Sequence, residues 1–300
     1  MTALAPALIT GCSSGMGRQT ALALHRKGHP VYATARRPDD LAALAAEGIT
    51  TLALDVTDEQ SMAAAVTRVE EEHGAVGVLV NNAAYGLHLP VELAGPEEVR
   101  AQFETNVFGA VRLVQLVLPA MRAAGSGRIV NISSMGGRFS PPGGGFYHAT
   151  KHAVEALSDS LRLEVAPFGI KVVVVQPGPT LTDFAGTAVT TMHGPADHDP
   201  YGTFRAELAD MYAHKTFTRR GGAVPVETAT RTIVRAATTA RPRARYAIGT
   251  VARTVMTARR LLPDAAFDAM LRRSFPLPLH APIRQSPSKR KSKTEESKWL

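Results

Sequence analysis

Short runs of β-branched residues alternate with longer segments of helical period through most of this 300-residue chain. This strand–helix–strand order predicts right-handed crossovers and a parallel sheet with helices on both faces. The run Val172–Val175 is apolar without alternation, as expected for a strand covered on both faces. The expected strands are residues 7–10, 30–34, 50–53, 78–81, 129–133, 171–176 and, more weakly, 245–248. The expected helices are residues 17–27, 39–47, 59–73, 97–124 and 147–168. The sequence therefore predicts an α/β fold with a doubly wound parallel sheet.

We expect one domain over residues 1–250, because no linker rich in Pro, Gly or Ser divides the first 180 residues. Within it, residues 180–222 break the strand–helix pattern, and their Thr, Gly, Pro and aromatic content predicts an irregular lid or binding loop. Residues 251–283 are expected to form a helical extension, and residues 284–300 a basic, disordered tail.

The net charge of +8 does not by itself indicate a polyanionic partner. Residues 284–300 hold six Lys and Arg against two Glu, so half of the excess positive charge lies in the tail, and we expect no nucleic-acid partner.

The lone Cys12 excludes an intrachain disulfide and a Cys-built metal site, and no metal is expected. No apolar run approaches the roughly 20 residues of a spanning helix, and the first residues lack a basic export signal. We therefore expect a cytoplasmic protein.

A glycine-rich turn, Thr10–Gly17, follows the first expected strand and opens the first helix. Its glycines permit a tight turn and let backbone N–H groups approach a pyrophosphate at the positive end of a helix. An ordinary strand-to-helix turn is the alternative. The position within the first βαβ unit favours dinucleotide binding.

The second expected strand ends in Arg36 and Arg37, where a carboxylate that binds the 2′-hydroxyl of NAD would otherwise lie. A guanidinium can instead bind the 2′-phosphate of NADP through charge-assisted hydrogen bonds. The site therefore favours NADP(H), although both arginines could also form a solvated helix entrance.

Three polar residues follow the next two expected strands. Asp55 can accept a hydrogen bond from the adenine amino group or cap the helix that begins near Asp58. Asn81 and Asn82 precede small residues that would let adenosine pass close to the backbone. The two asparagines could equally tie neighbouring strands together.

The strongest chemical signal is the pair Tyr147 and Lys151, which share one face of a helix. A nearby cation favours the phenolate and is expected to lower the tyrosine pKa, so that Tyr147 can exchange a proton with a substrate oxygen. Ser134, at the end of the preceding strand, can hold that oxygen. Ser133 should point to the other side of the strand. No role is expected for His148.

These motifs together resemble the short-chain dehydrogenase/reductases, in that family's order and spacing over residues 5–180. They are Thr-Gly-x-x-x-Gly-x-Gly at Thr10–Gly17, Asn-Asn-Ala at Asn81–Ala83, Asn106, Ser134, Tyr-x-x-x-Lys at Tyr147–Lys151, and Pro177–Gly178. Ala84 departs from the Gly that many members have at that position. The end of the second strand and the long C-terminal region are similar to the hydroxysteroid and retinol dehydrogenase side of the family.

The resemblance implies a Rossmann-type sheet of about seven strands and a catalytic tetrad. It makes Tyr147 the general acid/base, Lys151 a ribose-binding cation, Ser134 the substrate orienter and Asn106 the anchor of a proton-relay water. A helix cap at Asn106 and a turn at Ser134 are the alternatives. It implies that NADP contacts Gly11, Ser13, Ser14, Gly15, Met16, Gly17, Arg36, Asp55, Val56, Asn82, Ala83, Tyr147, Lys151, Pro177, Gly178 and Thr182.

The expected activity is NADP(H)-dependent interconversion of a carbonyl and a hydroxyl group. The lid carries several aromatic residues, which suggests a hydrophobic substrate of steroid, retinoid, fatty-acyl or polyketide kind, or an anchor of the lid to the core. A non-catalytic dinucleotide-binding regulator is the alternative, although such members of the family usually lack the Tyr or the Lys.

We expect a homodimer or homotetramer, paired through the helix of Tyr147. A basic amphipathic helix around Phe267 could touch a membrane surface or, as we favour, pack on the core. The aromatic residues of the lid are Phe184, Tyr201, Phe204, Tyr212 and Phe217.

Overall fold

A computed structural model describes residues 4–192 and 200–278 and contains one seven-stranded sheet. The strand order is β3-β2-β1-β4-β5-β6-β7, and every neighbouring pair is parallel. The strands are β1 (Ala7–Ile9), β2 (Val31–Ala35), β3 (Thr50–Ala53), β4 (Val78–Asn81), β5 (Gly127–Ile132), β6 (Ile170–Pro177) and β7 (Arg245–Ile248). This confirms the predicted doubly wound α/β fold. The chain reverses its direction of winding between β1 and β4, where such folds bind ligands at the carboxyl ends of the strands.

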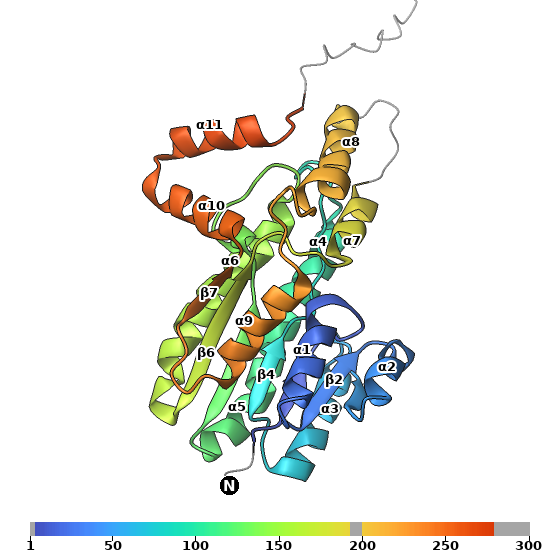
Figure 1. Cartoon of the computed structure of the whole chain (residues 1–300), viewed down its shortest axis with the longest axis vertical. Helices are drawn as coiled ribbons and strands as arrows, with labels where there is room; N and C mark the ends of the chain where they lie inside the picture. Colours follow the sequence, from blue (N-terminus) through green and yellow to red (C-terminus); the bar gives the residue numbers. More distant parts are fainter. Residues whose placement is uncertain (1–3, 193–199, 279–300) are drawn as a thin grey trace, which may run out of the picture.

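Helices cover both faces of the sheet and create two hydrophobic cores (Figure 1). Along β1, Ala7 and Ile9 pack into one core and Leu8 into the other, because successive side chains of a strand point to opposite faces. The side chains on both faces of β1 are apolar because helices cover both faces and neither meets water. One face carries α1 (Gly15–His25), α2 (Ala42–Ala45) and α9 (Val226–Thr238). The other carries α3 (Glu59–His73), α5 (Gly109–Ala123) and α6 (Gly145–Glu164).

The helix expected over residues 97–124 is divided in the structure. It consists of α4 (Pro96–Phe103), a π-helical turn over Glu104–Phe108, and α5. The residues expected as a helix over 39–47 form a short 3₁₀ turn, Pro38–Leu41, followed by α2. The apolar spacing indicated helix in both places but could not indicate the change of hydrogen-bond pattern.

Most of the described residues of the lid are helical, so the expected irregular structure is wrong for those residues. It contains α7 (Phe184–Thr191), α8 (Gly202–Met211) and a π-helical turn over Tyr212–Thr216, and Figure 1 shows α7 and α8 beyond the end of the sheet. These helices form because the lid has a small core of its own, which supports the anchoring role of its aromatic residues. That core consists of Ala188, Met192, Phe204, Leu208 and Tyr212, with Phe184, Phe217 and Phe275 among the residues packed against it.

The C-terminal extension forms α10 (Thr250–Leu261) and α11 (Asp264–Ser274). Phe267 of α11 is 3% exposed, and its ring lies 5.8 Å from that of Phe139, so the packed alternative describes this helix. The predicted disordered tail, residues 284–300, lies outside the described residues. Within the described ranges, no helix combines the length and apolarity needed to cross a membrane.

Candidate active site

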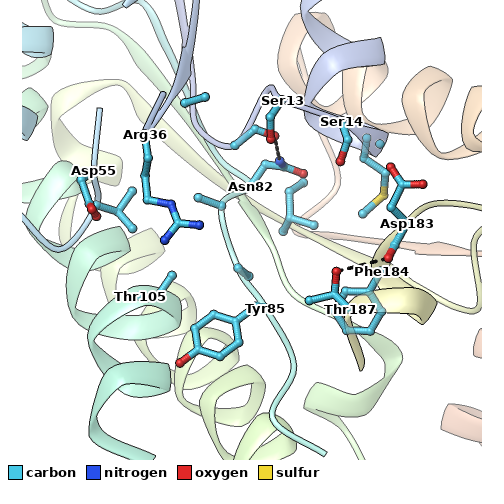
Figure 2. Close-up of a pocket in the computed structure, with 18 of the residues that line it drawn as sticks. Ser13, Ser14, Arg36, Asp55, Asn82, Tyr85, Thr105, Asp183, Phe184 and Thr187 are labelled. Carbon is cyan, nitrogen blue, oxygen red and sulfur yellow. Dashed lines mark hydrogen bonds between the residues drawn. The ribbon is translucent and has the colours of Figure 1, made fainter. Parts of the chain in front are cut away.

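A cavity of about 1180 Å³ opens at the carboxyl ends of the strands, where β1 and β4 diverge (Figure 2). This volume exceeds the roughly 300–1,000 Å³ typical of a small-molecule pocket, so an extended ligand can be accommodated. Most of the expected cofactor residues line it: Gly11, Ser13, Ser14, Gly15, Met16, Arg36, Asp55, Val56, Asn82, Ala83, Tyr147, Lys151 and Thr182. The sequence therefore identified both ends of one continuous cavity.

The glycine-rich turn brings α1 close to the end of β4. Gly11 has a φ of 71°, and a Cβ at Gly17 would lie 2.3 Å from the Gly11 carbonyl oxygen, so a side chain at Gly17 would clash with the turn. The Nδ2 atom of Asn82 donates to the carbonyl oxygens of Thr10, at 2.9 Å, and of Gly11, at 3.1 Å. Ser14, the N-cap of α1, makes no side-chain capping bond. The first N–H groups of α1 are thus directed toward the cavity as an anion-binding end.

Arg36 and Arg37 have different surroundings. Arg37 is paired with Asp40 at 3.0 Å, and its side chain is 80% exposed. Both arginines are among the residues that line the cavity, and Figure 2 shows the Arg36 guanidinium directed inward. Within the described residues it forms no ion pair, so its charge is available to a ligand. The alternative role, a solvent-exposed arginine at the start of a helix, therefore fits Arg37 better than Arg36.

The helix-cap alternative for Asp55 is wrong, because Asp58 is the N-cap of α3 and accepts from the N–H groups of Gln60 and Ser61. Asp55 lies on the cavity wall. Its Oδ1 atom accepts from the backbone N–H of Thr57 at 2.9 Å and from the Thr57 hydroxyl at 2.8 Å. These bonds orient the carboxylate beside the cavity.

The two asparagines after β4 do tie neighbouring strands together. Asn81 Nδ2 donates to Asn131 Oδ1 at 3.0 Å, which links β4 to β5. Asn82 links the end of β4 to the turn after β1, as described above, and it also lines the cavity. For Asn82 the structural role and the predicted cofactor contact are thus compatible.

Tyr147 and Lys151 are both buried, at 7% and 4% exposure, at the inner end of the cavity. Lys151 Nζ donates to the Ile132 carbonyl oxygen at 2.9 Å and lies 5.9 Å from the centre of the Tyr147 ring. Burial lowers the pKa of Lys151 to about 8, and the nearby Glu155 carboxylate opposes that shift. Burial raises the pKa of Tyr147 to about 12, and a hydrogen bond with Ser134 opposes that shift. Burial therefore dominates the pKa of Tyr147 in the chain without ligand, against the lowering that was expected from Lys151.

The alternative for Ser134 as a turn residue is also correct. Its Oγ atom accepts from the backbone N–H of Gly136 at 3.0 Å, which caps a 3₁₀ turn, and it contacts Tyr147 as well. Ser133 Oγ is buried near the position a Cβ at Gly137 would take, and Ser133, unlike Ser134, is among the residues that line the cavity.

Asn106 lies inside the π-helical turn, so it is not a helix cap. Its Oδ1 atom accepts from the backbone N–H of Tyr85 at 3.0 Å. Its Nδ2 atom donates to the Tyr85 carbonyl oxygen at 2.8 Å and to Thr150 Oγ1 at 3.1 Å. Asn106 thereby connects the segment after β4 to the helix of Tyr147.

Five of the expected residues lie outside the lining of the main cavity: Asn106, Ser134, Gly17, Pro177 and Gly178. Sequence reasoning did not assign several residues that do line it, including Tyr85, Thr105, Asp183 and Thr187. Phe184 closes the inner end, where its ring lies 5.5 Å from the Tyr147 ring. Phe184 is one of the lid aromatic residues that the sequence had placed near the substrate, and it does line the cavity.

The family model for short chain dehydrogenases matches residues 5–193. The chain belongs to this family. It is 48% identical over 177 residues to a 3-ketodihydrosphingosine reductase of Bacteroides thetaiotaomicron, a match that covers 59% of this chain and 64% of that relative. A short-chain dehydrogenase from Streptomyces avermitilis has a TM-score of 0.76 and 34% identity, over 90% of this chain and 96% of the other. The closed form of a serine dehydrogenase complexed with NADP⁺ has a TM-score of 0.70 and 25% identity, over 82% of this chain and 95% of the other.

Proposed function

We propose that this short-chain dehydrogenase uses NADP(H) to interconvert a ketone or aldehyde and a hydroxyl group on a hydrophobic substrate. The observation that carries the proposal is the position of Tyr147 and Lys151 at the inner end of the cavity whose other end holds the glycine-rich turn and Arg36. A non-catalytic regulator would have no need for a buried Tyr–Lys pair at that position. The pair therefore favours the enzyme.

The residues of the cavity suit NADP. The N-terminus of α1 would hold the pyrophosphate, Arg36 the 2′-phosphate and Asp55 the adenine amino group. The relative complexed with NADP⁺ supports the same choice. When bound, the cofactor supplies or accepts the hydride. The further contacts proposed are those of Gly11, Ser13, Ser14, Gly15, Met16, Gly17, Val56, Asn82, Ala83, Pro177, Gly178 and Thr182.

In the proposed mechanism, Ser134 orients the substrate oxygen and Tyr147 supplies its proton. A buried phenol with a pKa of about 12 is protonated at neutral pH, so it is ready to donate to the oxygen of a carbonyl that is being reduced. Lys151, held by the Ile132 carbonyl, places a positive charge near the phenol and would stabilise it after the proton has left. Asn106 anchors the surrounding segments.

The aromatic side chains that close over Tyr147 favour an apolar substrate. Phe184 and Phe217 have ring centres 6.1 Å apart, and Tyr212 and Phe217 have ring centres 5.4 Å apart. The relative named as a 3-ketodihydrosphingosine reductase acts on a keto group, according to its name, and supports a lipid-like ketone. Steroid, retinoid, fatty-acyl and polyketide ketones are the classes to compare.

We also propose that the protein works as a homodimer or homotetramer in the cytoplasm. Helix α6 presents large apolar side chains to solvent in the single chain, Leu157 at 44% exposure and Leu163 at 74%. Phe108, at 54%, lies just before α5. Covering such residues is favourable by roughly 25 cal/mol per Å² of apolar surface. A monomeric mass by light scattering at micromolar protein would contradict this assembly.

The decisive experiment measures NADPH and NADH oxidation by the full chain with apolar and polar ketones. We expect NADPH-dependent reduction of apolar ketones, and a loss of about 10²-fold or more in kcat for Tyr147→Phe. Tyr246→Phe, which removes a phenol from β7, is the matched control and should retain activity. Equal turnover by Tyr147→Phe and wild type would refute the mechanism. Small polar ketones turned over far better than apolar ones would refute the substrate class.

A further inference from the structure

Glu155 is a buried carboxylate that the proposed mechanism does not use. It lies four residues after Lys151, so the two side chains share one face of α6. Glu155 is 3% exposed and Lys151 is 4% exposed. Charged side chains are almost never buried to this extent unless they are paired, because burial removes their hydration. A buried carboxylate one helical turn beyond the cation of the cavity therefore calls for a reason.

Two donors from neighbouring strands hold the Glu155 carboxylate. Its Oε1 atom accepts from Gln176 Nε2 of β6 at 2.9 Å, and its Oε2 atom accepts from Arg245 Nε of β7 at 2.9 Å. The same arginine donates through Nη2 to Asp159 Oδ2 of α6. Each carboxylate oxygen of Glu155 is therefore bonded to a strand, and the negative charge has a fixed position between α6 and the sheet.

The Glu155 side chain lies close behind the wall of the cavity, at Gly137. A Cβ at Gly137 would lie 2.9 Å from Glu155 Cγ, 2.9 Å from the Lys151 carbonyl oxygen and 2.7 Å from Ser133 Oγ. Ser133 and Lys151 are among the residues that line the cavity. Because the carboxylate and the ammonium are both buried, little water screens the attraction between them.

The other charged side chains of the elements packed against α6 are exposed or bound elsewhere in the described part of the chain. In β5, Arg128 donates to the Ala236 carbonyl oxygen, and in β6, Lys171 donates to that of Ala240. The exposed ones are Glu97, Glu98 and Arg100 of α4 and Glu104 of the π-helical turn. Glu155 is the charge that acts on Lys151, and it raises the lysine pKa against the lowering by burial.

Two buried histidines lie against the Tyr147 ring, but they supply no charge at neutral pH. The ring centres of His88 and His148 each lie 5.3 Å from that of Tyr147. A Cβ at Gly144 would lie 2.9 Å from His148 Nε2 and 3.3 Å from His88 Cδ2, so the two rings meet at one point. Burial lowers the pKa of His88 to about 4 and that of His148 to about 3. Both are neutral at pH 7, so they do not alter the balance of charge around Lys151.

We propose that Glu155 is a positioning residue for the reaction, whose carboxylate keeps the ammonium of Lys151 charged. In the proposed mechanism this positive charge stabilises the phenolate of Tyr147 after the proton has left, and a neutral lysine could not do so. Gln176 and Arg245 fix the carboxylate where its charge acts on that cation. The inference rests on the proposed function and adds to it a residue that lies behind the cavity wall.

The first test measures the charge of Lys151 directly, in the full chain prepared with ¹³C-labelled lysine. Its NMR signal is identified by its absence in Lys151→Met. In the wild type this lysine should titrate near pH 8. In Glu155→Gln we expect its pKa to fall by about 1 unit or more, because a nearby opposite charge shifts a pKa by about 1–3 units. At pH 8 most of Lys151 would then be uncharged, against about half in the wild type.

A double variant separates the charge of Glu155 from its packing. In Glu155→Gln the new amide can present a donor to Arg245 Nε, so the single change also breaks a buried contact. Glu155→Gln combined with Arg245→Met removes both partners, which costs less stability than removing one. We expect the same fall in the pKa of Lys151 in the double variant.

Asp159→Asn is the matched control. It removes the other carboxylate that Arg245 binds, on the same helix, but this side chain is 42% exposed and lies about two turns from Lys151. Solvent screens such a charge, so the pKa of Lys151 should stay near the wild-type value.

The same relation should appear in turnover. With NADPH and an apolar ketone, kcat should decline on the alkaline side at a pH about 1 unit lower in Glu155→Gln and in the double variant than in the wild type. Asp159→Asn should keep the wild-type profile. A residue that only braces α6 against the sheet would lower kcat equally at every pH.

An unchanged pKa of Lys151 in Glu155→Gln and in the double variant would overturn the proposal. So would a fall in the single variant that the double variant reverses, because the contact with Arg245 would then set the pKa. A pH profile of kcat that does not move although the pKa falls would overturn it as well. If Glu155→Gln does not fold, the double variant decides. If the pKa falls as expected but the wild type reduces no ketone, the action of Glu155 on Lys151 is supported and the proposed function fails.

Discussion

Lys151 Nζ donates a hydrogen bond to the Ile132 carbonyl oxygen at 2.9 Å, and this bond joins the helix of Tyr147 to the last residue of β5. The ammonium is thereby held in place before any ligand binds. The carbonyl recovers only part of the hydration that the ammonium loses on burial. Its pKa is therefore lowered to about 8. The side chain that the proposed chemistry requires is thus a cost to the stability of the fold.

This cost should appear as a pH dependence of stability. The ordinary pKa of lysine in the unfolded chain is 10.5, so between about pH 8 and 10.5 the unfolded state binds a proton that the folded state has released. The free energy of unfolding contributed by Lys151 therefore rises with pH through that window, and the penalty is fully present below it. In Lys151→Met this contribution is absent. Urea denaturation of both proteins at about pH 7 and about pH 10 should show the wild type gaining stability relative to the variant. A difference that does not change with pH would contradict the assignment.

Arg36 should decide the choice between the two cofactors. Replacing Arg36 with Asp removes the unpaired guanidinium of the cavity and adds a carboxylate that repels a 2′-phosphate and can bind a 2′-hydroxyl. We expect the ratio of kcat/KM for NADPH to that for NADH to fall by about 10–100-fold. The neighbouring change Arg37→Asp is the control, and it should have a much smaller effect because Asp40 already holds that guanidinium. Equal effects of the two changes would show that the phosphate is not bound by Arg36 in particular.

The elements that the sequence predicted well are those that depend on local pattern. Strands β3, β4 and β7 have the predicted bounds, and α3 runs over the predicted residues, because apolar period and capping residues are written in consecutive positions. The Gly11–Gly17 turn and the Tyr147–Lys151 pair were found for the same reason. Each is a short motif whose spacing carries its chemistry.

The features that the sequence did not predict depend on distant partners. The π-helical turn is fixed by Asn106, whose bonds reach Tyr85 and Thr150, 21 and 44 positions away. The pKa of Tyr147 depends on its burial in the folded chain, which no local pattern records. His88 and His148 are each unremarkable in the sequence, and only the fold brings their rings to one point.

The close approach at Gly17 should make it intolerant of even a methyl group. In Gly17→Ala the new Cβ would meet the Gly11 carbonyl oxygen and Asn82 Nδ2, and overpacking of this kind costs about 1–3 kcal/mol. We expect a lower Tm and weaker NADPH binding, measured by thermal denaturation and by quenching of protein fluorescence. Gly186→Ala in α7 is the matched control, since nothing lies within 4 Å of its added Cβ. It should be neutral or raise stability by about 0.5–1 kcal/mol. Similar losses in both variants would argue against the clash.

Asn106 should be sensitive to a change of one atom. In Asn106→Asp, the bond from the Tyr85 N–H can persist, but a carboxylate oxygen would face the Tyr85 carbonyl in place of a donor. Because Asn106 is only 3% exposed, water cannot compensate, and we expect a loss of about 1–3 kcal/mol in the free energy of unfolding. The activity should fall in parallel, since Thr150, which shares this network, also donates to the Tyr147 carbonyl. Thr150→Val removes the two bonds of the Thr150 hydroxyl but buries no charge, so it should cost less than the aspartate. Urea denaturation measures the free energy of unfolding of both variants and of the wild type. An Asn106→Asp protein as stable as the wild type would show that these bonds do not hold the site together.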